Sequence, residues 1–493
     1  MRVFTIFLLA ILISNCSQPK KEKPLNILFI AVDDLRTDLG CYGNPVVQSP
    51  NLDQLAAEGT LFTRHYVQVP TCGASRYALL TGLRPQNRAY LRNDAIVEYI
   101  SKAPEKEAPE SFIHHLKRSG YHTVGIGKIS HSADGYVYGY EEEVSEKREL
   151  PHSWSDLAFN AGKWETGWNA FFAYADGENR QSMKKEVKPY EKGAVDDQGY
   201  PDGLSTQLAI EKLGALKDQD QPFLLALGLF KPHLPFTAPE KYWDLYDRSE
   251  VPLSPNPKVP KNVHLASLHP NGEFNQYKLG EEQATLDTPV SEAYARKLKH
   301  AYYAGVSYID AQIGLVLAEL KRLEMDDNTV IVVWGDHGWH LGDQQIWGKH
   351  TLFENALKST LIMKVPGLDN KAVQVNSIVE TVDLYPTIID LAGLAMPHDV
   401  DGESLVTALN GRDSDNLESR AFSYFKNGVS MRTPRYRITK YKREAQPNIE
   451  LYDHLNDPNE TINVATENPT VVADLLPELD KAYDKFHDNL STK

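Results

Sequence analysis

One cysteine of this 493-residue chain lies in a setting that could activate it chemically. Cys72 opens a predicted helix that ends at Thr81 and Gly82, and Arg76 follows one helical turn later. Backbone N–H groups and the dipole at a helix N-terminus favour negative charge, and the Arg76 guanidinium would add a cation beside it. Taken alone, Cys72 is more simply interpreted as a small buried hydrophobic residue. A catalytic role for it therefore depends on the other candidate residues.

Carboxylates follow two of the most apolar segments of the chain. Asp33 and Asp34 come directly after the first long apolar run, and Asp336 follows a later one, with His337 behind it. Hard carboxylate oxygens of this kind suit calcium, whereas the nitrogen of His337 is a softer ligand. Each aspartate alone could equally cap a helix or hold a turn. Three carboxylates at two expected strand ends favour a metal site.

Four further residues are candidates for binding an anion or moving a proton. Lys128 and Lys349 lie in short glycine-bounded stretches, and an acidic chain with a formal net charge of -15 needs such local cations to hold an anion. His131 and His233 are side chains that titrate near neutral pH, so they can donate or accept protons. Taken singly, a lysine is usually a solvated surface group, and a histidine in a proline-bounded loop is more often structural.

The elements that must position these side chains indicate an α/β fold. Continuous apolar runs without alternation are typical of strands buried on both faces of a parallel sheet, and helical stretches separate them. We expect a large mixed, mostly parallel sheet with helices on both faces and ligands beyond the carboxyl ends of its strands. The expected strands are residues 25–32, 121–126, 223–230, 329–334 and 360–365, and the expected helices are residues 51–59, 111–119 and 293–323.

The remaining segments differ in composition. Residues 134–200 are rich in Gly, Tyr, Trp and charge, and residues 250–290 are similarly aperiodic, so both are expected to form loops. The aromatic residues of the first segment could line a sugar pocket or could belong to the core. We expect a catalytic domain over residues 24–415 and a small C-terminal α+β subdomain over residues 416–493, with a short antiparallel sheet and a closing helix.

The start of the chain predicts export. Residues 1–23 combine Arg2, a short apolar core and then Ser-Asn-Cys, which resembles a bacterial lipoprotein signal with a lipid anchor at Cys16. Asn15 is unusual before such a cysteine, so plain secretion stays open. We expect a periplasmic protein or a lipoprotein of the outer membrane or cell surface. In that compartment Cys41 and Cys72 could form a disulfide, and the negative charge disfavours nucleic acid as a partner.

Residues 72–76, Cys-Gly-Ala-Ser-Arg, followed by Thr-Gly at residues 81 and 82, resemble the signature Cys-x-(Pro/Ala)-x-Arg of the sulfatase family. In that family the cysteine is oxidised to formylglycine. The other candidate residues lie in stretches that have counterparts in the family, in the same order and over most of the chain. Within the family the resemblance is strongest to the iduronate-2-sulfatase group, because Lys128 and His131 have its Lys-x-x-His spacing and residues 231–236 read Lys-Pro-His-Leu-Pro-Phe.

The resemblance implies one calcium ion at the end of the sheet. Its ligands would be Asp33, Asp34, Asp336 and His337, together with residue 72 after its conversion to formylglycine. Related phosphodiesterases that share this fold often bind two metals through additional Asp and His ligands. The motifs of this chain favour a single ion.

The resemblance also implies a mechanism. The hydrated aldehyde at position 72 would attack the sulfur of a sulfate ester, with the pKa of its hydroxyl lowered by calcium. His233, assisted by Lys349, would protonate the departing alcohol, and His131 would help to remove a proton from the second hydroxyl, which expels sulfate. Arg76 and Lys128 would hold the diol and the sulfate oxygens.

The expected substrate is a sulfated carbohydrate that contains uronic acid, of the ulvan, carrageenan or glycosaminoglycan type. The expected partner is a maturase that makes formylglycine, and Ala74, where many relatives have Pro, favours an oxygen-independent one. Two alternatives stay open. One is a formylglycine-dependent phosphodiesterase or phosphonate hydrolase, and the other is an inactive lipoprotein that binds glycans.

Overall fold

The computed structural model describes residues 24–368, 372–411 and 420–488. The predictions of a signal and of a lipid anchor at Cys16 concern residues that lie outside this range. The expected domain boundary at residue 415 also lies outside the described residues. Within them, no helix combines the length and the apolarity needed to cross a membrane.

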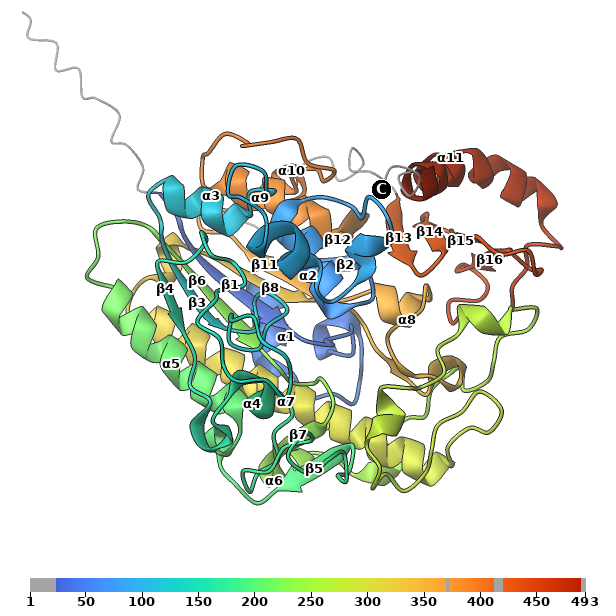
Figure 1. The fold of residues 1–493 in the computed structure, drawn as a ribbon, viewed down its shortest axis with the longest axis horizontal. Coiled ribbons are helices and arrows are strands. Elements are labelled where there is room, and N and C mark those ends of the chain that lie inside the picture. The colour runs from blue at the N-terminus through green and yellow to red at the C-terminus, as the bar shows by residue number, and fades with distance from the viewer. Residues whose placement is uncertain (1–23, 369–371, 412–419, 489–493) are drawn as a thin grey trace, which may run out of the picture.

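An eight-stranded sheet forms the centre of the molecule, as Figure 1 shows. Only β11 runs antiparallel to its neighbours, so the expected mostly parallel sheet is confirmed. Its strands, in spatial order, are β12 (Val373–Glu380), β2 (Thr60–Tyr66), β11 (Leu361–Lys364), β8 (Thr329–Gly335), β1 (Asn26–Val32), β6 (Phe223–Leu229), β3 (His122–Gly127) and β4 (Asp156–Ala158).

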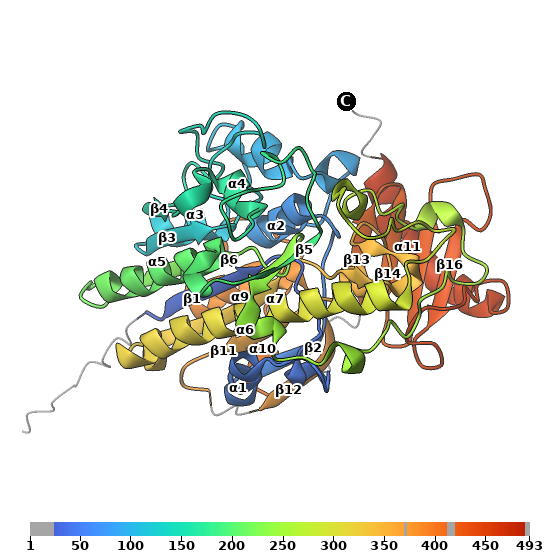
Figure 2. The same cartoon turned by 90° about the horizontal axis from the view of Figure 1, so that it is seen from below.

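Helices cover both faces of this sheet. The side chains of β1 alternate between two separate cores, with Leu28 and Ile30 in one and Ile27 and Phe29 in the other. One core contains α1 (Pro50–Glu58), α5 (Pro201–Leu216) and α7 (Glu292–Arg322). The opposite core contains α2 (Cys72–Thr81), α3 (Phe112–Arg118), α9 (Leu384–Leu391) and α10 (Val406–Leu409), and Figures 1 and 2 show the two layers.

The two aperiodic segments are mainly connections, as expected. The first also supplies the edge strand β4, the short helix α4 (Gly167–Phe171) and β5 (Tyr190–Gly193), which pairs with β7 (Phe236–Pro239). Several of its aromatic residues form a small core of their own around Trp164, Trp168 and Phe171. The second segment contains only short 3-10 turns, and α6 (Glu240–Trp243) precedes it.

The C-terminal part is a four-stranded antiparallel sheet that α11 (Pro469–Asp488) covers. Its strands are β13 (Ala421–Phe425), β14 (Gly428–Arg432), β15 (Tyr436–Tyr441) and β16 (Ile449–Asp453). The same hydrophobic cluster includes Val69 and Ala74, and the Tyr424 N–H donates to the Gln68 carbonyl at 2.7 Å. The C-terminal sheet therefore packs directly on the start of α2, as Figure 1 also shows.

Candidate functional site

Four neighbouring parallel strands bring the predicted residues to one edge of the sheet. Strands β8, β1, β6 and β3 lie side by side. Val32 at the end of β1 pairs with both Gly335 and Leu229, and Gly127 at the end of β3 pairs with Gly228. Asp33, Asp336 and Lys128 each follow directly after one of these strands, and His233 follows β6 by four residues. Side chains from distant parts of the chain therefore meet beyond the carboxyl ends of the strands.

Cys72 lies at the middle of this group as the first residue of α2. Its buried Sγ is 3.4 Å from Oδ1 of Asp33, 3.2 Å from Nε2 of His337 and 3.3 Å from Nζ of Lys349. Burial raises the pKa of the Cys72 thiol to about 12, and the Asp33 carboxylate acts in the same direction. Sγ marks the position that an oxygen of formylglycine would take after modification.

The residue after Cys72 has to be small. A Cβ on Gly73 would lie 2.1 Å from the Asn93 carbonyl oxygen, so the backbone of α2 approaches this loop closely. The first N–H groups of a helix have no partner within the helix itself. The Gly73 N–H is one of them, and it donates a 3.0 Å hydrogen bond to the Asn93 side chain. The close approach of Gly73 to Asn93 holds the first turn of α2 over the strand ends.

Each buried carboxylate has a cationic partner. Lys128 forms an ion pair with Asp33, Lys349 reaches Oδ1 of Asp34 at 3.0 Å, and Arg76 contacts Oδ2 of Asp336 through two nitrogens, at 3.0 and 2.9 Å. Burial raises the pKa of Asp33, but Lys128 and the surrounding cations outweigh burial and hold that pKa well below its usual value.

The carboxylates also fit a hard metal ion. Ligand atoms of Asp33, Cys72, Asp336 and His337 lie within 4.8 Å of one another, and a second such group includes Asp34. Oδ2 of Asp34 is buried without a hydrogen-bond partner, and burial raises the pKa of this carboxyl well above its usual value. A cation beside this oxygen would stabilise the charged form of the carboxyl, and the oxygen-rich ligand set suits calcium.

His233 faces this centre from the loop after β6. Its Nε2 is 3.2 Å from Oε1 of Glu273 and 3.8 Å from Oδ2 of Asp34, while Nδ1 contacts the Leu234 carbonyl at 2.6 Å. That carbonyl requires a proton on Nδ1, which leaves Nε2 directed at the site. Burial and Lys349 lower the pKa of His233 to about 4, against the opposite influence of nearby carboxylates.

His131 lies at the side of the group. Its ring packs 5.4 Å from the Trp168 ring, and within the described residues it forms no side-chain hydrogen bond. Burial and Lys128 hold its pKa well below the usual value, so charges of the site act on it. The small aromatic core around Trp164 packs against the site. Its Phe171 ring lies 4.6 Å from the His233 ring and 4.2 Å from Nζ of Lys128.

Two residues of the site and its surroundings were not predicted from the sequence. Glu273 contacts His233, and its Oε2 is 3.8 Å from Nζ of Lys349, yet it lies in an aperiodic loop where no pattern marks it. Arg180 is 4% exposed and lies over the Phe172 ring at 3.5 Å. The only feature of the sequence that could have indicated Arg180 is its place in residues 134–200, whose composition differs from that of the sheet. A disulfide between Cys41 and Cys72 is excluded, because both cysteines are free.

Comparisons with known proteins agree with this geometry. The sulfatase family profile matches residues 25–394, and the profile described as "N-sulphoglucosamine sulphohydrolase, C-terminal" matches residues 335–486. Iduronate 2-sulfatase of Mus musculus is 32% identical over 76% of this chain and 69% of its own length. An ulvan-active sulfatase of Formosa agariphila is 26% identical over 97% of this chain and 84% of its own.

A solved structure shows the same fold. The phosphonate monoester hydrolase of Agrobacterium radiobacter superposes with a TM-score of 0.76, at 23% identity, over 93% of this chain and 96% of its own. At this identity the likeness concerns the fold alone. The family profile covers most of the chain, including the strand ends and the Cys72 helix. The chain therefore belongs to the sulfatase family.

Proposed function

We propose that this protein hydrolyses sulfate esters on a carbohydrate that contains uronic acid, with residue 72 as formylglycine and one calcium ion. The observation that carries the proposal is the convergence of three strand-end carboxylates, His337 and Cys72 at one buried point, with cations around it. A sulfate ester is an anion, and it needs such cations in a protein whose net charge is -15.

The metal would be held by Asp33, Asp34, Asp336 and His337, with residue 72 beside them. When bound, calcium supplies positive charge that polarises oxygen atoms at the site and lowers the pKa of a hydroxyl. A buried thiol whose pKa is about 12 is a poor nucleophile at neutral pH. The hydrated aldehyde of formylglycine supplies a hydroxyl nucleophile and a second hydroxyl whose deprotonation releases sulfate.

The remaining residues have roles that follow from their positions. The Lys128 ammonium acts on Cys72, and Arg76 lies one turn along the same helix; both cations would hold the diol and the sulfate oxygens as charge shifts. His233 presents Nε2 to the site and would donate a proton to the departing sugar oxygen. A bound sulfate beside the ring favours its protonated form. Lys349 would assist His233, and His131 would accept the proton from the second hydroxyl.

The uronate assignment is supported by the 32% identity to iduronate 2-sulfatase and by the shared Lys-x-x-His spacing. The ulvan-active relative extends the candidate polymers beyond glycosaminoglycans. Arg180 is a candidate for contact with a substrate carboxylate, because this nearly buried cation lies among rings next to the site. A site built to bond polar ring groups rejects analogues that leave those groups unpaired.

We further propose export as a lipoprotein anchored at Cys16, or as a secreted periplasmic protein, and maturation by an oxygen-independent enzyme. Ala74 motivates the second point, since oxygen-dependent maturases generally prefer Pro at that position. Co-expression with each type of maturase, followed by a count of formylglycine per chain, tests it. Full conversion by the oxygen-dependent enzyme alone would contradict it.

One panel assay tests the activity. The purified enzyme is incubated with sulfated oligosaccharides, an aryl sulfate and an aryl phosphate, and released sulfate and phosphate are measured. We expect sulfate from the aryl sulfate and from uronate-containing sugars. Release only from sugars without a uronic acid would overturn the uronate assignment. Turnover of phosphate esters alone would favour a phosphodiesterase or phosphonate hydrolase, and no turnover at all would favour an inactive glycan-binding protein.

A further inference from the structure

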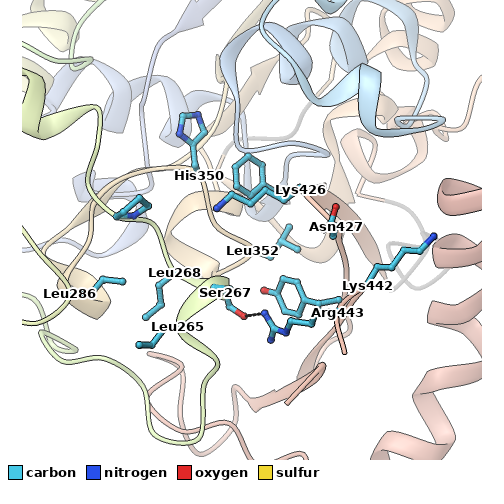
Figure 3. Close-up of a pocket in the computed structure, with 14 residues that line it drawn as sticks. Leu265, Ser267, Leu268, Leu286, His350, Leu352, Lys426, Asn427, Lys442 and Arg443 are labelled. Carbon is cyan, nitrogen blue, oxygen red and sulfur yellow. Dashed lines mark hydrogen bonds between the residues drawn. The ribbon is translucent and has the colours of Figure 1, made fainter. Parts of the chain in front are cut away.

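A separate cavity adjoins the site on the side of the C-terminal sheet. Its volume is about 390 Å³, and three parts of the chain enclose it, as Figure 3 shows: the loop around Leu268, the residues just after Lys349, and the ends of β13 and β15 with the loops that follow them. The cavity shares two segments with the site. His350 lines it directly after Lys349, and the loop that carries Leu268 continues to Glu273.

One wall of the cavity is apolar. Leucines 265, 268, 286 and 352 line it together with Phe425, whose ring stacks on His350 at 5.5 Å with an interplanar angle of 4°. Burial lowers the pKa of His350 to about 3, so its ring is neutral at physiological pH. Apolar and aromatic walls with a few polar groups are typical of small-ligand sites, and they suit the C–H faces of a sugar ring.

A cation without an acidic partner points into this cavity. Figure 3 shows the Lys426 side chain directed between His350 and Leu352, whereas the Lys442 side chain points away. Lys426 remains exposed to solvent, yet desolvation lowers the pKa of its ammonium, and no carboxylate of the described residues raises it. Arg443, the other cation of this wall, is already bonded to Ser267 at 2.9 Å and to Glu450 at 3.0 Å.

The backbone at Lys426 is strained. Lys426 and Asn427 form the two-residue loop between β13 and β14, where Phe425 pairs with Gly428. The φ of Lys426 is 51°, a left-handed value that glycine or asparagine adopts more readily. A long cationic residue at such a position has a conformational cost without a compensating ion pair. Two-residue hairpin loops commonly need a positive φ, so the turn itself accounts for this conformation.

We propose that this cavity binds an anionic sugar ring next to the ring that carries the scissile sulfate. The apolar wall and Phe425 would cover the faces of the sugar, and the Lys426 ammonium would pair with its carboxylate or sulfate. The inference rests on the proposed function and makes it more specific. The substrate is an oligosaccharide with a second negative charge one ring away from the cleaved ester.

Steady-state kinetics of the formylglycine-bearing enzyme test this inference. Lys426→Asn removes the charge and tolerates the left-handed backbone. We expect it to raise KM for a sulfated uronate oligosaccharide about tenfold, with kcat little changed, because one charge-assisted hydrogen bond is lost. Turnover of an aryl sulfate, which has no second ring, should stay as in the wild type. Lys426→Arg keeps the charge and should keep KM within about twofold of the wild-type value.

Two controls make the result decisive. Lys442 lies in the same wall, but its side chain points away from the cavity. Lys442→Asn should therefore leave KM and kcat unchanged for both substrates. An oligosaccharide whose neighbouring carboxyl is reduced to an alcohol should show equal KM values with the wild type and Lys426→Asn. Equal effects of Lys426→Asn on the aryl sulfate and the oligosaccharide, or no effect on either, would overturn the anionic subsite. An enzyme that releases sulfate from neither substrate would overturn the proposed function itself, and with it the subsite.

Discussion

The backbone N–H of Asp34 donates a 3.0 Å hydrogen bond to Oδ1 of Asp336, which joins the segments that follow β1 and β8 and are 302 residues apart in sequence. The parallel register of the two strands makes this contact possible, because Val32 pairs with Gly335. The carboxylate of Asp336 is held in turn by Arg76 from α2. The proposed metal ligands and the Cys72 helix are therefore one hydrogen-bonded unit.

Asp33→Asn should lower calcium content and activity together, because the charge of the ligands sets the affinity. Elemental analysis and sulfate release measure the two quantities. The change also leaves Lys128 buried without its carboxylate, which is expected to destabilise the fold by about 3–5 kcal/mol. Thermal unfolding must therefore be recorded alongside. Asp38→Asn is the control, since Asp38 follows the same strand but pairs with Arg36. Full activity after exhaustive chelation would rule out the metal.

His233→Gln should reduce turnover more for a poor leaving group than for a good one. A sugar alcohol departs poorly without a proton, so its sulfate ester should lose about 10²–10⁴-fold in kcat. An aryl sulfate with an acidic phenol departs readily as the anion and should lose much less. The ratio of the two rates is the measurement. Equal losses on both substrates would show that His233 does not protonate the departing oxygen.

Glu273→Gln tests the residue that the sequence did not reveal. The substitution keeps the size of the side chain and removes the charge beside His233 and Lys349. We expect kcat on a sugar sulfate to fall about tenfold, because charge-assisted hydrogen bonds that position both groups are weakened. The effect should be much smaller in a His233→Gln background. Independent, additive effects would show that Glu273 does not act through His233.

Most of the large sheet could be predicted, because the strands β1, β3, β6, β8 and β11 are short, mainly apolar runs. The strand β2 and the edge strand β12 were not predicted, because Arg64, His65 and Gln374 interrupt their apolar pattern. Glu273 could not be predicted for a different reason. It reaches the site through the course of a long loop, and the local sequence does not encode which buried groups that loop will meet. For the aromatic residues near Trp164, composition alone could not separate core from pocket.

A pair of glycine substitutions tests the close approach at α2. Gly73→Ala would place a methyl group 2.1 Å from the Asn93 carbonyl oxygen and should destabilise the protein by about 1–3 kcal/mol. Gly214→Ala, in the exposed part of α5 with open space around it, should stabilise it by about 0.5–1 kcal/mol. Denaturant unfolding measures both changes. Similar stabilities for the two variants would contradict the packing described at Asn93.

Peptide mass spectrometry of the active enzyme tests the central claim most directly. The peptide that contains residue 72 should have lost hydrogen sulfide and gained oxygen, relative to the sequence with Cys72, in proportion to the specific activity of each preparation. Cys72→Ala should abolish activity, and its thermal unfolding should stay close to that of the wild type. Fully active protein with an intact thiol at Cys72 would contradict the account.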